Sequence, residues 1–329
     1  MKAVILHSAV NDDAGNDERD VLVQVESVAK ALSTLGYEVF AIPFYLDLAC
    51  MRTALDAIRP RFAFNLVETV EQAGRLIHAA PALLDHLQLP YTGASTEAVF
   101  VTSNKLLAKK LLSGAGIPTP PWLSLEDAKV NGHAAKGAHI IKSIWEHASI
   151  GLDEDSVVVV NGCGQLLQAL EHRRESLGGA CFAEAYIDGR EFNLSILASN
   201  NGPEVLPPAE IEFVRFPADK KKVVGYRAKW EVGSFEYDHT VRRFDFGRED
   251  EPLIAQLRQM ARDCWRLFEL RGYARVDFRV DQAGRPWVLE VNTNPCLSPD
   301  GGFFAAAEQC GLSYVKVIQR IVRDLDAAS

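Results

Sequence analysis

The stretch Gly272-Tyr-Ala-Arg-Val-Asp-Phe-Arg-Val-Asp-Gln-Ala-Gly-Arg-Pro-Trp-Val-Leu-Glu-Val-Asn-Thr-Asn-Pro295 has the residue pattern of a β-hairpin. Polar and apolar residues alternate along it on both sides of the turn-forming pair Ala283-Gly284. If the turn is centred on this pair, Asp277 lies opposite Glu290. Both carboxylates then point to the same face of the hairpin, because alternate residues of a strand share a face.

Two carboxylates that oppose each other across a hairpin are destabilising unless a cation lies between them. The same register places Arg275 opposite Asn292, on the same face. Oxygen ligands from Asp277, Glu290 and the Asn292 amide are the set that Mg²⁺ prefers, with Mn²⁺ as an alternative. The solvent-exposed face of an ordinary hairpin would also carry carboxylates, but it does not explain the sequence Asn292-Thr-Asn-Pro295 directly after the strand. The pattern therefore favours a metal site.

The motif Arg275-x-Asp277, followed by Leu289-Glu-Val-Asn-Thr-x-Pro295, resembles the C-terminal metal-binding motif of ATP-grasp ligases, particularly D-alanine–D-alanine ligases. The resemblance extends over nearly the whole chain and is weaker where substrates would bind. It implies that Asp277, Glu290 and Asn292 hold two Mg²⁺ ions against the phosphates of ATP. Arg275 would stabilise an acyl phosphate or its tetrahedral successor.

Residues 1–90 read as alternating strands and helices. Apolar segments predict strands at 3–7, 39–44 and 62–67, and helical spacing predicts helices at 21–35 and 76–87. This order predicts a parallel sheet that is covered on both faces. Because ligands of such sheets bind beyond the carboxyl ends of the strands, we expect the acidic loop after His7 and the segment 65–68 to border a cleft.

The rest of the chain continues as a mixture of helices and strands. Patterning predicts a helix at 104–113, strands at 139–142 and 157–160, a helix at 165–174, strands at 181–187 and 192–198, a long polar segment, and helices at 252–268 and 314–325. The class is α/β (α+β overall). By resemblance it is an ATP-grasp fold behind an N-terminal Rossmann-like parallel-sheet domain, with domains at 1–94, 95–183 and 184–329.

Three lysines match ATP-contacting positions of the family. Lys105 opens a helical segment, and Lys142 ends the strand His139-Ile-Ile-Lys142. The resemblance implies that both contact phosphate. Lys229, in the segment Tyr226-Arg-Ala-Lys-Trp230, would cover the γ-phosphate from a mobile loop.

The segment from Glu184 to Phe192 resembles the hinge between the two ATP-grasp subdomains. The backbone of the residues after Glu184, including Tyr186 and Ile187, would then bind adenine, and Glu191 would bind the ribose hydroxyls. The family's phosphate flap corresponds to 143–151. Ser149 and Gly151 keep the small residue type of the flap, whereas Trp145 and His147 either narrow the substrate cleft or pack on the flap.

The match is weakest for the residues that would contact substrate. Glu18 occupies the position at which the family's ligases hold the amine of the first amino acid, although acidic residues also favour helix N-termini. Glu68 either binds a substrate ammonium or caps a helix. Cys296 replaces a glycine whose N–H helps to form the oxyanion site, so the substrate identity is open, and a nucleophilic role for this cysteine is an alternative.

Composition limits the class of protein. Of 329 residues, 48% are hydrophobic and 24% charged, as in globular proteins. The net charge of −9 argues against nucleic-acid binding, and no apolar run is long enough to span a membrane. The six cysteines are scattered without a C-x-x-C pair, and the N-terminus lacks a secretory signal, so we expect a cytoplasmic protein.

The predicted function is ATP-dependent ligation of a carboxylate to an amine through an acyl phosphate, with small-molecule substrates that are expected to be amino acids. The family suggests a homodimer. A true D-alanine–D-alanine ligase of cell-wall synthesis is the alternative within this class. An ATP-grasp kinase and a non-catalytic nucleotide-binding regulator are the alternatives outside it.

Overall fold

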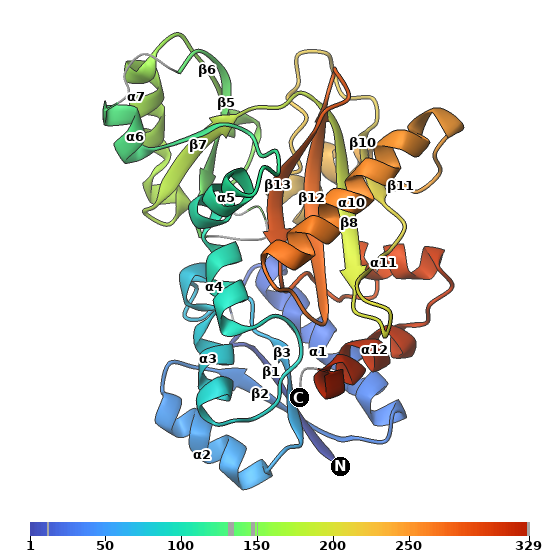
Figure 1. Cartoon of the computed structure of the whole chain (residues 1–329). Helices are drawn as coiled ribbons and strands as arrows, with labels where there is room; N and C mark the ends of the chain where they lie inside the picture. Colours follow the sequence, from blue (N-terminus) through green and yellow to red (C-terminus); the bar gives the residue numbers. More distant parts are fainter. Residues whose placement is uncertain (12, 131–134, 146–148, 150, 328–329) are drawn as a thin grey trace.

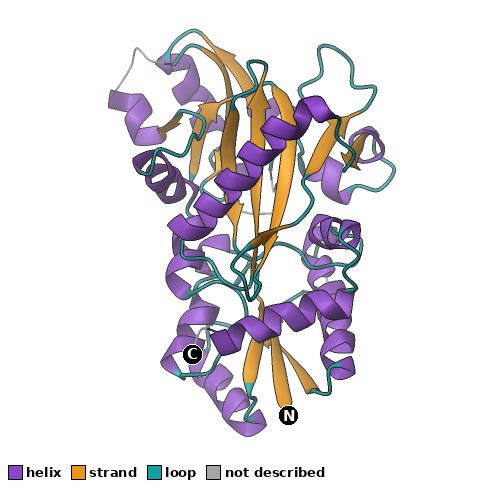
Figure 2. Ribbon diagram, turned by 45° about the vertical axis from the view of Figure 1, so that its right-hand side comes forward, coloured by secondary structure: helices purple, strands orange, loops and turns teal. Residues whose placement is uncertain are grey.

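The computed structural model describes residues 1–11, 13–130, 135–145, 149 and 151–327 (Figure 1). Three β-sheets organise the described chain, and helices cover them. The N-terminal sheet lies at the bottom of the views, with the two other sheets above it (Figure 2). No described helix combines the length and apolar character needed to cross a membrane.

The N-terminal sheet is parallel, as predicted, with strand order β2-β1-β3. Its elements in chain order are β1 (Lys2–Ser8), α1 (Asn16–Thr34), β2 (Glu38–Phe44), α2 (Leu48–Ile58), β3 (Phe62–Leu66) and α3 (Ala79–His86). Alternate side chains of β1 enter different cores. Ala3 and Ile5 pack with residues of α1, whereas Val4 and Leu6 pack with residues of α2 and α3. Both faces are therefore covered.

The second sheet is antiparallel and follows two connecting helices. The connecting helices are α4 (Thr96–Ser103) and α5 (Lys105–Gly114). The sheet has the strand order β4-β7-β5-β6. Its elements in chain order are β4 (Trp122–Ser124), α6 (Leu125–Val130), β5 (Gly137–Ser143), β6 (Val157–Val160), α7 (Cys163–Arg173) and β7 (Cys181–Ala185). Ile141 and Ala183 pack against Leu166 and Leu170 of α7. The neighbouring residues in these strands, such as Lys142, therefore point to the opposite face of the sheet, away from α7.

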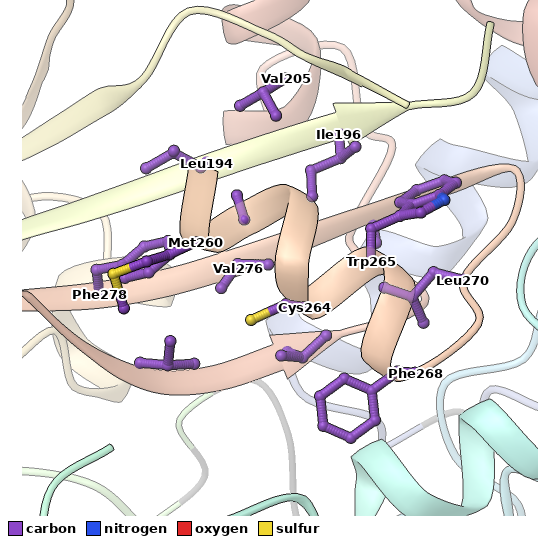
Figure 3. Packing of buried hydrophobic residues seen from close by; sticks show 14 of the residues in the cluster. Leu194, Ile196, Val205, Met260, Cys264, Trp265, Phe268, Leu270, Val276 and Phe278 are labelled. Carbon is purple, nitrogen blue, oxygen red and sulfur yellow. The ribbon is translucent and has the colours of Figure 1, made fainter. Parts of the chain in front are cut away.

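The third sheet is also antiparallel and carries the predicted hairpin. Its path is β11-β10-β8-β12-β13, with β9 beside β8, and its elements are β8 (Gly189–Leu197), β9 (Glu204–Val205), β10 (Ala209–Phe213), α8 (Tyr226–Trp230), α9 (Phe235–His239), β11 (Thr240–Arg243), α10 (Glu251–Leu267), β12 (Tyr273–Asp281) and β13 (Pro286–Asn292). Helix α10 lies across one face. Its Met260, Cys264 and Trp265 pack on apolar residues of β8 and β12, including Ile196 and Val276 (Figure 3).

The sequence pattern missed elements in several places, among them the helices α2, α4 and α11 (Gly302–Gln309). The long polar segment contains five more, all of them short. Strands β9, β10 and β11 and helices α8 and α9 have five residues or fewer each. Elements of this length do not show a full hydrophobic period, and tertiary contacts rather than intrinsic propensity stabilise them. Strand β10 is held by its pairing with β8, and β11 is held by its pairing with β10.

The last two helices return to the N-terminal sheet. These are α11 (Gly302–Gln309) and α12 (Tyr314–Ala327). Phe303 and Ile318 are fully buried in the same core as Ala3 and Ile5, so the two ends of the chain share one hydrophobic core. Figure 1 shows α12 beside α1.

Substituting Gly189 by alanine tests how tightly β8 packs on β12. A Cβ atom on Gly189 would lie 1.9 Å from the backbone oxygen of Val280, which cannot rotate away. We expect Gly189→Ala to lower the free energy of unfolding by about 1–3 kcal/mol. Gly164→Ala in α7 is the control, because that Cβ meets nothing within 4 Å, and it should raise stability by about 0.5–1 kcal/mol. Urea denaturation of both variants measures the difference, and equal midpoints would contradict the packing.

Candidate functional site

The hairpin places its predicted side chains opposite one another. Asp277 pairs with Glu290 and Arg275 with Asn292, which confirms the predicted register at these positions. The register shifts by one residue between Asp277 and Phe278, so the prediction is wrong nearer the turn. A bulge of this kind places two residues of one strand opposite one of the other, which lets consecutive residues of β13 line the same cavity.

Two carboxylates and two cationic side chains meet at the hairpin, where Lys105 Nζ lies 3.9 Å from Glu290 Oε2. Nε and Nη2 of Arg275 donate to Oδ1 and Oδ2 of Asp277 at 2.7 and 2.8 Å, whereas Glu290 Oε1 lies 4.0 Å from Arg275 Nη2. Burial raises the pKa of Asp277, and Glu290 adds to this increase, against the opposing effect of Arg275. Asn292 Oδ1 accepts from the N–H of Asn294 at 3.0 Å and keeps a second lone pair. This oxygen set fits a hard divalent cation.

A cavity of about 600 Å³ lies beside the polar face of the hairpin. Every residue predicted for catalysis, nucleotide or metal, apart from Glu18, lines it: Lys105, Lys142, Ser149, Glu184, Tyr186, Ile187, Glu191, Lys229, Arg275, Asp277, Glu290 and Asn292. The second and third sheets both contribute their polar faces. The cavity is therefore where the predicted residues come together.

Glu184 forms a buried ion-pair cluster that the sequence analysis only partly identified. Its Oε2 lies 2.6 Å from Lys109 Nζ, and its Oε1 pairs with Lys142. Lys109 also donates to Thr119 Oγ1 at 2.8 Å and is 1% exposed. Burial lowers the pKa of Lys109, and Glu184 opposes this effect. The sequence signal for Lys109 was its position four residues after Lys105, on the same face of a helix.

The hinge after Glu184 offers one free backbone donor. The N–H groups of Ala185 and Tyr186 donate to the carbonyls of Pro121 and Ala138. Among the described residues, the N–H of Ile187 has no hydrogen-bond partner, and its residue lines the cavity. Adenine binding by this segment stays a prediction, for which the N–H of Ile187 is an available donor.

Glu191 pairs with a residue that the sequence analysis did not select. Arg279 Nη2 lies 2.6 Å from Glu191 Oε2. Arg279 shares the cavity face of β12 with Arg275 and Asp277 because all three occupy alternate positions. Strand alternation could have identified it.

The segment that carries Lys229 lies over the cavity and contacts two other parts of the molecule. Ser149 Oγ donates to the carbonyl of Val224 at 2.9 Å, and the N–H of Tyr226 donates to Leu152. On the other side, the Tyr226 hydroxyl donates to Asp17 Oδ1 at 2.8 Å. Burial and the nearby Arg275 lower the pKa of Lys229. Residues 223–230, called the lid segment below, are thus held to Ser149 and Leu152 on one side and to α1 on the other.

The end of the cavity near α1 carries Asp20 and Glu68, and Glu18 is not part of its wall. The buried Gln24 amide donates to Asp20 Oδ2 at 3.0 Å and to Glu68 Oε1 at 2.9 Å. Glu68 does not cap a helix through its side chain, because the next helix, α3, has no side-chain cap. Burial, opposed by the hydrogen bond from Gln24, raises the pKa of Glu68 to about 7.

Cys296 has the environment of a neutral thiol. Its Sγ donates to Asp20 Oδ2 at 3.0 Å, and burial together with Asp20 raises its pKa well above the usual range. A thiolate nucleophile needs the opposite shift, so the structure argues against the nucleophilic alternative. Of the two flap residues, Trp145 packs near Phe100, with ring centroids 6.1 Å apart, and does not line the cavity. His147 lies outside the described residues.

Known proteins are similar to this chain in sequence and in fold. The model of the family described as D-ala D-ala ligase C-terminus matches residues 111–323. An uncharacterized protein, y4sG of Sinorhizobium fredii, is 30% identical over 305 residues, which cover 90% of this chain and 85% of that protein. The D-alanine–D-alanine ligase of Marinomonas sp. is 30% identical over 314 residues, covering 93% of this chain and 92% of the enzyme.

The structural similarity covers the whole chain. The crystal structure of the D-alanine–D-alanine ligase from Bacillus anthracis complexed with ATP matches with a TM-score of 0.71 and 20% identity. The match covers 100% of this chain and 98% of that chain. The predicted ATP-grasp fold with its parallel-sheet unit is confirmed.

Replacing Lys109 by methionine tests the buried cluster around Glu184. The variant keeps the side-chain length but leaves the carboxylate with Lys142 alone, so we expect a loss of about 3 kcal/mol in the free energy of unfolding. Lys110→Met, at the exposed neighbouring position, should change stability by less than about 0.5 kcal/mol. Chemical denaturation compares the two, and a similar small effect in both would rule out the cluster as a stabilising feature.

Proposed function

The chain belongs to the D-alanine–D-alanine ligase family of ATP-dependent carboxylate–amine ligases, and from this membership we propose that it joins two amino acids. The observation that carries the proposal is the pair of opposed carboxylates beside Arg275 in a cavity that several lysines also line. Such a cavity suits a polyphosphate and its cations, because positive side chains and a divalent ion balance its charge.

We propose that ATP lies between the second and third sheets. Lys105 and Lys142 would contact its phosphates, with Ser149 at the flap. The free N–H of Ile187 would donate to adenine while Tyr186 lines the same end of the cavity. Glu191 would accept from the ribose hydroxyls and share its carboxylate with Arg279. Glu184 acts in this proposal by holding Lys142 in place.

The carboxylates of the hairpin would hold Mg²⁺, with Mn²⁺ as an alternative. Asp277, Glu290 and Asn292 supply only oxygen ligands, and we propose that they hold two ions. When bound, the metal supplies charge neutralisation at the phosphates.

The proposed reaction has two steps. The carboxylate of the first substrate attacks the γ-phosphorus of ATP, the bond from that phosphorus to the bridging oxygen breaks, and ADP leaves. The amine of the second substrate then attacks the acyl carbon, loses a proton and displaces phosphate. Arg275 would stabilise the charge that develops on the acyl group, and Lys229 would contact the transferred phosphoryl group. The lid segment would exclude water from the acyl phosphate.

At the substrate end of the cavity, the residues that we propose to contact the amino acid differ from the one that the family motif predicts. Because Glu18 does not line the cavity, we propose that Glu68 and Asp20 bind the ammonium group of the first substrate instead. D-alanine–D-alanine ligation itself remains the alternative, which the names of relatives favour.

The remaining proposals concern the whole protein. We propose domains at 1–94, 95–183 and 184–329, a homodimer, and a location in the cytoplasm. The absence of disulfides supports that location, since all six cysteines are free.

The first test is phosphate release from Mg·ATP with an array of amino acids, singly and in pairs, and with dipeptides. We expect release that depends on a particular pair, and we expect Asp277→Asn to lower it by about a hundredfold or more. Asp263→Asn, on the exposed side of α10, is the matched control and should retain activity.

The outcomes of this assay separate the candidate functions. Release with D-alanine alone would identify a D-alanine–D-alanine ligase. Phosphorylated product without a second amine would identify a kinase. ATP binding without release in any combination would overturn the ligase proposal.

The pKa of Glu68 predicts how substrate affinity depends on pH. Its carboxylate protonates as the pH falls through about 7, whereas the ammonium group of a free amino acid stays charged. Asp17 and Asp20 on α1 raise this pKa, and Arg275 on β12 lowers it. We expect the KM of the first amino acid to rise by up to about tenfold for each pH unit below 7.

Glu68→Gln provides the comparison for this pH profile. We expect a higher KM that no longer depends on pH between about 6 and 8, because the amide does not titrate. An unchanged pH profile in the variant would show that another group controls binding.

A further inference from the structure

Arg242 lines the cavity from the edge of the third sheet. It lies on β11 opposite Ile211 of β10, and both residues belong to the cavity wall. Directly opposed residues of an antiparallel pair project to the same face, so the register itself directs Arg242 to the cavity. The sequence analysis assigned it no role.

The neighbouring Arg243 has a different environment. It lies 2.5 Å from Glu210 Oε2 and 2.9 Å from Glu212 Oε1, so two carboxylates balance its charge. Arg242 has no carboxylate within ion-pairing distance in the part of the chain that the structure describes. Its Nη1 donates to the backbone oxygen of Asp300 at 3.0 Å, which fixes one edge of the guanidinium. The other donors remain for a ligand.

The residues that follow Asp300 leave the guanidinium accessible. A Cβ atom on Gly302 would lie 3.6 Å from Arg242 Nε, so a side chain at this position would contact the guanidinium. Gly301 and Gly302 line the cavity together with Arg242, and a Cβ on Gly301 would lie 3.5 Å from Cys296 Sγ. Arg242 therefore belongs to the substrate end of the cavity.

Most other cations of the cavity already have carboxylate partners. Lys142 pairs with Glu184, Arg275 with Asp277, and Arg279 with Glu191. Arg242 differs from these arginines in having only a backbone oxygen as its partner. An arginine in this position recognises a planar anion better than a neutral group, because its donors match the two oxygens of a carboxylate.

We propose that Arg242 binds a carboxylate of the amine substrate and is thereby a specificity-determining residue. The inference rests on the proposed ligase function and assigns the residue that selects a second substrate with a free carboxylate over its carboxamide.

The test uses α-amino acids, including both enantiomers of alanine, and their carboxamides as second substrates in the phosphate-release assay. In Arg242→Gln we expect the KM for the active amino acid to rise about tenfold or more, with kcat changed less than about threefold. The KM for its carboxamide should be the same in the wild type and the variant. Arg242→Lys should recover part of the affinity, since it keeps the charge but not the paired donors.

Arg243→Gln is the matched control, because it removes an arginine from the adjacent position without changing the cavity wall. It should leave the ratio of the two KM values unchanged. Equal losses for acid and amide in Arg242→Gln, or equal use of both by the wild type, would overturn the inference while the ligase function stands. Release that no amine stimulates in the wild type would instead show that the proposed function is wrong, and this inference with it.

Discussion

The ion pair between Arg275 and Asp277 sets the constraint on which the cavity depends. Two charged side chains on the same strand can be buried together only if they neutralise each other, and the opposing Glu290 lies 3.9 Å from Lys105 Nζ. The strands that carry these charged side chains have apolar residues on the opposite face of the sheet, where they pack into the core. Val276 and Phe278 meet this need by packing under α10, so charge on one face and burial on the other come from the same alternating sequence.

This alternation explains what could be predicted from the sequence. The hairpin, the opposed carboxylates and the parallel N-terminal sheet all follow from local periodicity, and the structure confirms each. The bulge beyond Asp277 could not be predicted in the same way, because an extra residue leaves the polar and apolar pattern almost unchanged. The predicted family membership depended on motif spacing rather than on periodicity.

Other parts of the site depend on contacts between distant segments. Gln24 joins α1 to Glu68 and to the N–H of Leu297, and no local pattern relates these three positions. The contacts at this end of the cavity therefore could not be assigned from the sequence, and Asp20 lines the cavity wall whereas Glu18, which has the expected motif position, does not. The residues proposed to bind the nucleotide follow motifs, whereas those proposed to select a substrate depend on how loops meet.

The shared core of the two chain ends has a consequence for synthesis on the ribosome. Part of one face of the N-terminal sheet packs on Phe303 and Ile318, which are translated long after the sheet. Helix α1 covers this face only in part, so the first strands emerge with apolar surface that α11 and α12 cover later. A nascent chain therefore keeps part of this surface uncovered until α11 and α12 have been made, which makes chaperone protection most valuable early in translation and makes loss of these two helices more damaging than their distance from the hairpin suggests.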